Sequence, residues 1–149
     1  MNKVFKGRVI VAGNLKGEAL VSHRGFNTLA SFQKSLVTRA KIARCSDQDN
    51  KDLYQKVMTG KILCLPQTVG STTGGMVILT VAQMGLHPAA MLFSKPIDSL
   101  AAAGIIMTDV WLNKKIITLD SLGDDFLQTV KSGQLLEINE EGEVRILDS

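Results

Sequence analysis

Cysteine and histidine are scarce in this sequence of 149 residues. It contains two cysteines, Cys45 and Cys64, and two histidines, His23 and His87, and none of them belongs to a CxxC motif or a Cys/His cluster. A structural zinc site takes four such ligands, and an iron–sulfur cluster takes several cysteines. By itself the chain therefore lacks the ligand spacing of either centre. Two thiols also do not predict a disulfide framework.

Aromatic residues are few as well, at 5% of the sequence. The 17 Lys and Arg residues nearly balance the 14 Asp and Glu residues, which leaves a net charge of +3. The basic residues are dispersed along the chain, whereas a nucleic-acid surface gathers them on one face, often with aromatic residues between them. The sequence therefore argues against nucleic acid as a partner.

Long apolar runs are also missing. No uninterrupted apolar stretch reaches the roughly 18 residues that a membrane-spanning helix needs, and the first residues do not have the layout of a signal peptide. The hydrophobic fraction of 45% is nevertheless enough to build a core. We expect a soluble, cytoplasmic protein without membrane contact, folded as a single domain over residues 1–149.

Short apolar runs bounded by glycine, proline and polar residues predict strands, and longer ones predict helices. Asp98 is placed to cap the second of three predicted helices. The predicted fold is mixed α/β, with a small central parallel sheet, flanking helices and β-hairpins at both ends. Residues 26–34 fit neither pattern clearly. The expected strands are 4–12, 17–21, 36–43, 61–65, 89–93, 116–119, 134–138 and 144–147. Three helices are expected: one begins near residue 71 and ends at 84, and the other two span 99–111 and 124–131.

The segment 66–75, Pro-Gln-Thr-Val-Gly-Ser-Thr-Thr-Gly-Gly, joins a buried strand to a buried helix. Ligands bind at such strand ends, and a helix N-terminus favours an anion. No Gly-Lys-Ser/Thr follows, so the segment is not a P-loop. Ser71 or Thr72 is alternatively an ordinary helix cap. Three glycines would permit close approach of a ligand and three hydroxyls could contact it: Gly70, Gly74 and Gly75, and Ser71, Thr72 and Thr73.

Together these segments resemble the swivel domain of the aconitase X family. The resemblance implies a swivelling β/β/α fold and a small subunit that pairs with a large aconitase X subunit. It also implies an iron or iron–sulfur cluster, carried by that large subunit and not by this chain. The segments that carry the resemblance are, in the expected order, Gly7–Val11, Gly17–Val21, Gly60–Pro66, the Gly-Ser-Thr-Thr-Gly at 70–74, Ala89–Phe93 and Ile97–Gly104.

The same resemblance implies a hydro-lyase that dehydrates a small hydroxy acid and is inactive without its large partner. In the wider aconitase superfamily a serine of the swivel domain abstracts the proton, and Ser71 occupies the matching position. The resemblance also places several neighbouring residues at the substrate: Gly70, Thr72 and Thr73 in the turn, and Asn27 and Thr28 in an earlier segment.

Two branches of the family differ in substrate. Segments 25–33, 45–48 and 93–99 resemble the bacterial branch that dehydrates cis-3-hydroxy-L-proline, which is the expected substrate. The archaeal phosphomevalonate dehydratases are the alternative. A phosphotransfer-like swivelling module is a further alternative, although it would need a histidine where Met76 and Val77 follow the glycines. A non-catalytic binding module also remains open.

Overall fold

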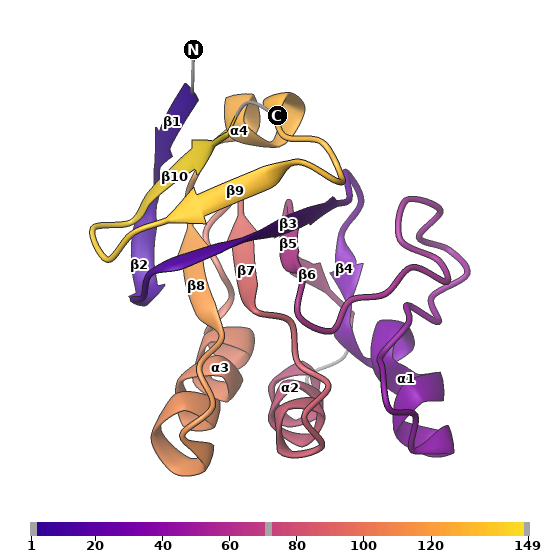
Figure 1. The fold of residues 1–149 in the computed structure, drawn as a ribbon. Coiled ribbons are helices and arrows are strands. Elements are labelled where there is room, and N and C mark those ends of the chain that lie inside the picture. Colours follow the sequence, from indigo (N-terminus) through magenta and orange to yellow (C-terminus); the bar gives the residue numbers. More distant parts are fainter. Residues whose placement is uncertain (1–2, 71–72, 148–149) are drawn as a thin grey trace.

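The computed structural model describes residues 3–70 and 73–147. Within them, eight strands form one sheet in the order β1-β10-β9-β3-β5-β7-β8-β2, and two short strands pair separately (Figure 1). The strands are β1 (Lys3–Lys6), β2 (Arg8–Val11), β3 (Leu15–Val21), β4 (Phe26–Asn27), β5 (Ile62–Leu65), β6 (Thr68–Val69), β7 (Ala90–Phe93), β8 (Ile117–Asp120), β9 (Leu135–Ile138) and β10 (Glu143–Ile146). The helices are α1 (Thr28–Thr38), α2 (Gly74–Gln83), α3 (Ser99–Leu112) and α4 (Asp124–Thr129).

Strand β3 belongs to both halves of the sheet. Residues 15–18 pair antiparallel with β9, and residues 19–21 pair parallel with β5. The parallel half continues through β7 and β8, whereas in the other half β10 pairs antiparallel with both β9 and β1. Helices α1, α2 and α3 lie side by side below the parallel strands, and β9, β10 and α4 lie on the other side (Figure 1). The result is three layers, two of strands and one of helices.

The two faces of the parallel strands point into two different cores. All four residues of β5 are buried. Leu63 and Leu65 join the core beneath the helices, while Ile62 and Cys64 join the core shared with β9, β10 and α4. Strand β7 alternates in the same way. Because successive side chains of a strand point to opposite faces, a strand covered on both sides has a continuous apolar sequence.

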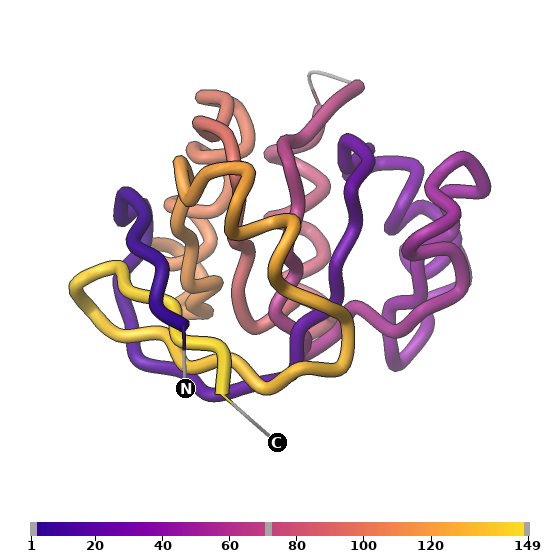
Figure 2. Tube along the Cα trace, turned by 90° about the horizontal axis from the view of Figure 1, so that it is seen from above, coloured from indigo at the N-terminus to yellow at the C-terminus, as the bar shows by residue number. Residues whose placement is uncertain are grey.

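The two edge strands of the sheet are joined by a single residue, Gly7. Strand β1 pairs with β10 at one end of the sheet and β2 pairs with β8 at the other. The sheet therefore curls until its edges meet, and Figure 2 shows the indigo start of the chain between the yellow C-terminal strands and the orange β8 segment. A Cβ atom at Gly7 would lie 2.7 Å from the carbonyl oxygen of Asp120, so this closure requires glycine.

The predicted N-terminal hairpin is wrong. The predicted strand 4–12 divides at Gly7 into β1 and β2, and β2 pairs with β8 while β3 pairs with β9 and β5. Gly13 lies between the two predicted strands but does not close a hairpin. A Cβ atom there would lie 2.6 Å from the Cδ1 atom of Ile117. The glycine therefore serves close packing against β8, and the chain crosses to a different part of the sheet.

The predicted strand 36–43 is also wrong. Helix α1 continues to Thr38, and Arg39 ends it in the left-handed conformation with a φ of 52°. The ambiguous segment 26–34 resolves into β4 and the first part of this helix. Three of the four buried positions of α1 carry small hydroxyl side chains, so the buried face of the helix does not show the apolar spacing that predicts a helix. Those four positions are Thr28, Ser31, Phe32 and Ser35.

The remaining predicted elements agree with the structure to within three residues at their ends. The predicted C-terminal hairpin is confirmed by the antiparallel pairing of β9 with β10. The mixed α/β class, with its central parallel strands and flanking helices, is confirmed as well. Within the described ranges, no helix has the length and apolar character required to cross a membrane.

Candidate functional site

The small sheet of β4 and β6 brings together the two segments that the sequence placed at the site. Phe26 lies opposite Thr68, and Asn27 lies opposite Val69, in parallel register. The backbone N–H of Phe26 also donates to the carbonyl of Gln67 at 2.8 Å. The Asn27–Thr28 segment and Gly70 in the turn are 42 or more positions apart in the chain, yet they lie side by side. Both segments lead directly into helices.

Asn27 and Gly70 are in direct contact. The side-chain Oδ1 atom of Asn27 accepts a hydrogen bond from the N–H of Ala30 at 3.0 Å, which caps α1. A Cβ atom at Gly70 would lie 2.9 Å from the Nδ2 atom of Asn27. Gly70 also has a φ of +99°, a conformation that favours glycine. The asparagine is therefore a helix cap whose amide nitrogen lies against the turn.

Thr28 is buried at the first position of α1, with 3% of its surface exposed. A Cβ atom at Gly74, the first residue of α2, would lie 3.7 Å from the Thr28 Oγ1 atom. The N-termini of α1 and α2 therefore meet at the turn. Each helix N-terminus carries free N–H groups and a partial positive charge, so the pair favours an anionic group between them.

Four of the six predicted site residues are placed by the structure: Gly70 and Thr73 in the turn, and Asn27 and Thr28 beside it. Ser71 and Thr72 lie outside the described residues. Thr73 precedes the first residue of α2, so the described helix begins three residues after the position expected for its first turn. Substrate contact by the four placed residues stays a prediction.

The carboxylate of Asp98 accepts two hydrogen bonds, one of which the sequence predicted. Its Oδ2 atom accepts from the N–H of Ala101 at 2.9 Å, which confirms the predicted cap of α3. Its Oδ1 atom accepts a short hydrogen bond from the hydroxyl of Thr68 in β6. The start of α3 is thereby tied to the strand that leads into the turn.

Gly75 was expected to admit a ligand, but its position in the structure serves helix packing. A Cβ atom at Gly75 would lie 2.4 Å from the carbonyl oxygen of Leu100 in α3. A Cβ atom at Gly104 would in turn lie 2.4 Å from the carbonyl oxygen of Gly75. The backbones of α2 and α3 therefore touch at these two glycines, which fixes the first turn of α2 beside α3.

The two cysteines are not placed for metal binding or nucleophilic chemistry. Burial raises the pKa of the Cys64 thiol and also that of Cys45, although hydrogen bonding at Cys45 offsets part of the effect. A thiol that stays protonated is a poor nucleophile and metal ligand. Across residues 3–70 and 73–147, no three His, Cys, Asp or Glu side chains are grouped closely enough to hold a metal ion.

A family model described as the aconitase X swivel domain matches residues 4–146. The chain belongs to the aconitase X swivel domain family. It is 29% identical over 147 residues to the phosphomevalonate dehydratase small subunit of Thermococcus gammatolerans, with 97% of this chain and 98% of that protein covered. The Pyrococcus furiosus protein of the same name is 29% identical over 146 residues, with coverage of 96% and 95%.

The likeness extends to a solved structure. The crystal structure of Thermococcus kodakaraensis aconitase X in its holo-form is similar with a TM-score of 0.82 at 26% identity. The match covers 98% of this chain and 99% of that chain. The aconitase X resemblance found in the sequence is therefore confirmed, and so is the fold that it implied.

Within this aconitase X swivel domain, sequence reasoning missed the ion pair of Arg8 and Asp120. The fully buried carboxylate of Asp120 accepts from the Arg8 Nε and Nη2 atoms at 2.9 and 2.6 Å, and from the N–H of Ile97 at 2.7 Å. Burial alone would raise the pKa of Asp120, but the hydrogen bonds and the charge of Arg8 outweigh it and lower that pKa. The pair anchors Ile97, the residue directly before the Asp98 cap. No local motif reveals it, because the partners are 112 positions apart.

Proposed function

We propose that this chain is the small subunit of an aconitase X-type dehydratase that removes water from phosphomevalonate together with a large subunit. The observation that carries the proposal is the near full-length match to small subunits that bear this name. The match includes β4 and β6, the paired strands beside the turn, since it covers 97% of the chain. Dehydration of cis-3-hydroxy-L-proline, the substrate expected from segments 25–33, 45–48 and 93–99, stays a prediction and becomes the second candidate.

Both candidate substrates would be dehydrated by the same reaction. Each is a carboxylate with a hydroxyl on the β-carbon. A base takes the proton from the α-carbon, the C–H electron pair forms the new double bond, and the β-hydroxyl leaves with a proton as water. The substrates differ elsewhere: phosphomevalonate carries a phosphate, whereas the proline derivative carries a ring amine. An assay with both substrates therefore separates the branches without changing the catalytic step.

We assign the base to Ser71 and substrate contacts to its neighbours. A serine of ordinary pKa is a weak base, so its anionic form needs stabilisation. The meeting N-termini of α1 and α2 supply free N–H groups and positive dipole ends at this place. The buried hydroxyl of Thr28 and the amide nitrogen of Asn27 lie beside the same turn. We place the substrate's carboxylate here, in contact with Gly70, Thr72 and Thr73.

The large subunit is expected to hold the iron or iron–sulfur cluster. When bound, such a metal polarises a departing hydroxyl as a Lewis acid. The described part of this chain does not offer the ligands, because its thiols are buried and no group of three ligating side chains is present there. The contribution of the small subunit is then the proton acceptor and the orientation of the substrate.

An apolar surface around the turn supports contact with a large subunit. Helix α3 is apolar on nearly all sides and has a single charged residue, Asp109. A helix of that kind is normally buried, yet much of its outer side is exposed here. Exposed apolar patches of this kind mark interaction sites. The exposed side chains are Leu29, Val69 and Met76 near the turn, and Leu100, Ile106, Val110 and Trp111 along α3.

The deciding experiment is co-expression of this chain with its large subunit, followed by assays with phosphomevalonate and cis-3-hydroxy-L-proline under identical conditions. We expect a stable complex on size exclusion and turnover of phosphomevalonate, with none by either chain alone. Turnover of the proline derivative alone would transfer the assignment to the second candidate. A complex inactive on both substrates, or turnover by the isolated small chain, would refute the proposal.

A further inference from the structure

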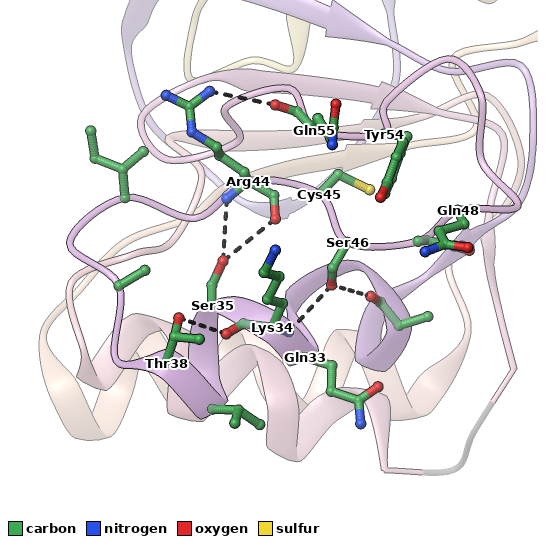
Figure 3. Close-up of a pocket in the computed structure, with 15 residues that line it drawn as sticks. Gln33, Lys34, Ser35, Thr38, Arg44, Cys45, Ser46, Gln48, Tyr54 and Gln55 are labelled. Carbon is green, nitrogen blue, oxygen red and sulfur yellow. Dashed lines mark hydrogen bonds between the residues drawn. The ribbon is translucent and has the colours of Figure 1, made fainter.

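A pocket of about 940 Å³ lies between the outward side of α1 and the segment 40–55 (Figure 3). Its lining comes from residues 30–38, 40–48 and 54–55, and is thus separate from the turn at Gly70. The volume is within the range of small-molecule sites, about 300–1,000 Å³. The proposed dehydration does not involve this pocket.

The two walls of the pocket are fixed to each other by hydrogen bonds. The Ser46 hydroxyl donates to the carbonyl of Ala30 at 2.5 Å, and its backbone N–H donates to the carbonyl of Ser31 at 2.9 Å. The N–H of Arg44 donates to the Ser35 hydroxyl at 3.2 Å. The pocket is therefore formed in the absence of a ligand, which lowers the entropic cost of binding.

The pocket is lined by two cations, Lys34 and Arg44, and by one carboxylate, Asp47, so its lining carries a net positive charge. Within residues 3–70 and 73–147 neither of the two cations forms an ion pair. Figure 3 shows the Lys34 amine between Ser35 and Ser46 in the middle of the pocket. The Arg44 Nη1 atom donates to the carbonyl of Gln55 at 3.4 Å, which leaves most guanidinium donors free among the described contacts.

An apolar rim lies next to these cations. Val37 is 76% exposed and Ile42 is 48% exposed. The phenol of Tyr54 and the amide of Gln48 border the pocket on the side away from the Arg44 guanidinium (Figure 3). Covering these exposed apolar side chains with the hydrocarbon part of a ligand would remove apolar surface from water, which favours binding. The pocket thus combines two cations that are unpaired within the described residues, one carboxylate, an apolar edge and neutral hydrogen-bonding groups.

The thiol beneath the pocket does not offer covalent chemistry. Cys45 is 1% exposed, and burial raises its pKa. It therefore remains a protonated thiol at neutral pH, and a ligand here is held by non-covalent contacts.

We infer that this pocket binds a small organic anion with a short hydrocarbon body. Its carboxylate or phosphate pairs with Lys34 and Arg44, which are suited to either group. Its hydrocarbon part covers Val37 and Ile42. The inference is independent of the dehydration reaction, since the pocket shares no residue with the turn.

The test is an NMR titration of the full ¹⁵N-labelled chain at constant ionic strength with hexanoate, hexyl phosphate and the uncharged hexanamide. We expect at least one of the two anions to bind saturably, with a Kd of about 1 mM or tighter and shifts confined to residues 30–56. Hexanamide should bind roughly tenfold or more weakly. The stronger of the two anions identifies the charged group of the ligand.

Lys34→Gln should weaken anion binding roughly tenfold, whereas Lys41→Gln, an exposed lysine outside the lining, should leave it unchanged. Equal binding of hexanamide and the anions, equal effects of the two lysine variants, or shifts spread over the whole surface would each overturn the inference. Repetition on the assembled complex adds a further criterion. If the large subunit abolishes binding and Lys34→Gln weakens assembly, the pocket is a subunit contact and not a ligand site.

Discussion

The hydroxyl of Thr68 and the carboxylate of Asp98 form a hydrogen bond that joins β6 to the N-terminus of α3. The same carboxylate caps α3 through Ala101, and Ile97 beside it is held by Asp120. A continuous set of contacts therefore runs from the buried end of β8 to the strand that precedes Gly70. Since the turn follows β6 directly, this set of contacts determines where the turn begins.

Thr68→Val should lower turnover of the assembled enzyme while leaving the fold intact. Valine has nearly the shape of threonine but cannot donate to Asp98. A hydrogen bond to a charged group contributes about 1.5–3 kcal/mol, and loss of the lower part of that from the transition state slows turnover roughly tenfold. The measurement is kcat and KM of the complex, with the melting temperature of the small subunit recorded alongside.

Thr68→Ser is the matched control, because it keeps the hydroxyl and removes a methyl group. We expect it to restore most of the turnover. If valine and serine lower kcat equally, the contact is one of packing. If neither changes kcat, the position of the turn does not depend on Asp98.

Most of the fold could be predicted from the sequence because strands covered on both sides leave a plain signal. The apolar runs at β5, β7 and β8 are bounded by glycine, proline or polar residues, and each was found to within one residue of its position. The cap at Asp98 was found for a similar reason, since a capping carboxylate acts on the next three residues of the chain.

The errors arose where non-local packing overrides local pattern. Gly7 and Gly13 look like turn residues, yet they are needed because β8 approaches closely. Helix α1 buries serine and threonine, which an apolar search does not detect. The site was predicted in part, since the pairing of Asn27 with Val69 and the ion pair of Arg8 with Asp120 each join positions more than 40 residues apart. Such contacts require the three-dimensional structure.

Two adjacent glycines at the start of α2 should respond differently to alanine. In Gly75→Ala the new methyl would collide with the Leu100 carbonyl at 2.4 Å, so the helices must separate. Overpacking of this kind costs about 1–3 kcal/mol of unfolding free energy. In Gly74→Ala the nearest atom is Thr28 Oγ1 at 3.7 Å, an ordinary contact. Urea denaturation should show a loss of unfolding free energy for Gly75→Ala and little change for Gly74→Ala. Equal losses in the two variants would contradict the close contact between α2 and α3.

Asp120→Asn should reduce stability in a pH-dependent way. The pKa of Asp120 is lowered in the folded protein, so unfolding is accompanied by proton uptake in acid. The stabilisation is fully present above the ordinary aspartate pKa of about 3.9 and is lost as the pH falls through the folded-state pKa. At pH 7 the variant should lose roughly 1–3 kcal/mol of unfolding free energy. The difference in unfolding free energy between wild type and variant should narrow toward about pH 3.

Urea denaturation of both proteins across that pH range measures this difference. Glu137→Gln is the control, because its contact with Lys16 is an exposed pair at 3.9 Å and contributes at most about 1 kcal/mol. A gap between wild type and Asp120→Asn that does not change with pH would show that the charge of Asp120 is not what stabilises the fold.

Ser71→Ala in the assembled enzyme should abolish dehydration with little effect on folding or assembly. The meeting N-termini of α1 and α2 favour an anionic oxygen beside Gly70, and Ser71 is the next residue of the chain. Loss of a general base typically lowers the rate by about 10²–10⁴-fold. Loss of a helix cap instead costs about 0.5–2 kcal/mol of stability with turnover largely kept. Turnover and melting temperature therefore distinguish the two roles.

Thr72→Ala and Thr73→Ala are the controls, because each removes a neighbouring hydroxyl that we assign to substrate contact. They should raise KM more than they lower kcat, since a binding hydroxyl acts on ground state and transition state alike. Ser71→Ala should lower kcat at saturating substrate. If it keeps more than about a tenth of the wild-type turnover, the deficit is smaller than removal of a base predicts. Ser71 would then be a cap, and the base would have to be sought elsewhere, first on the large subunit.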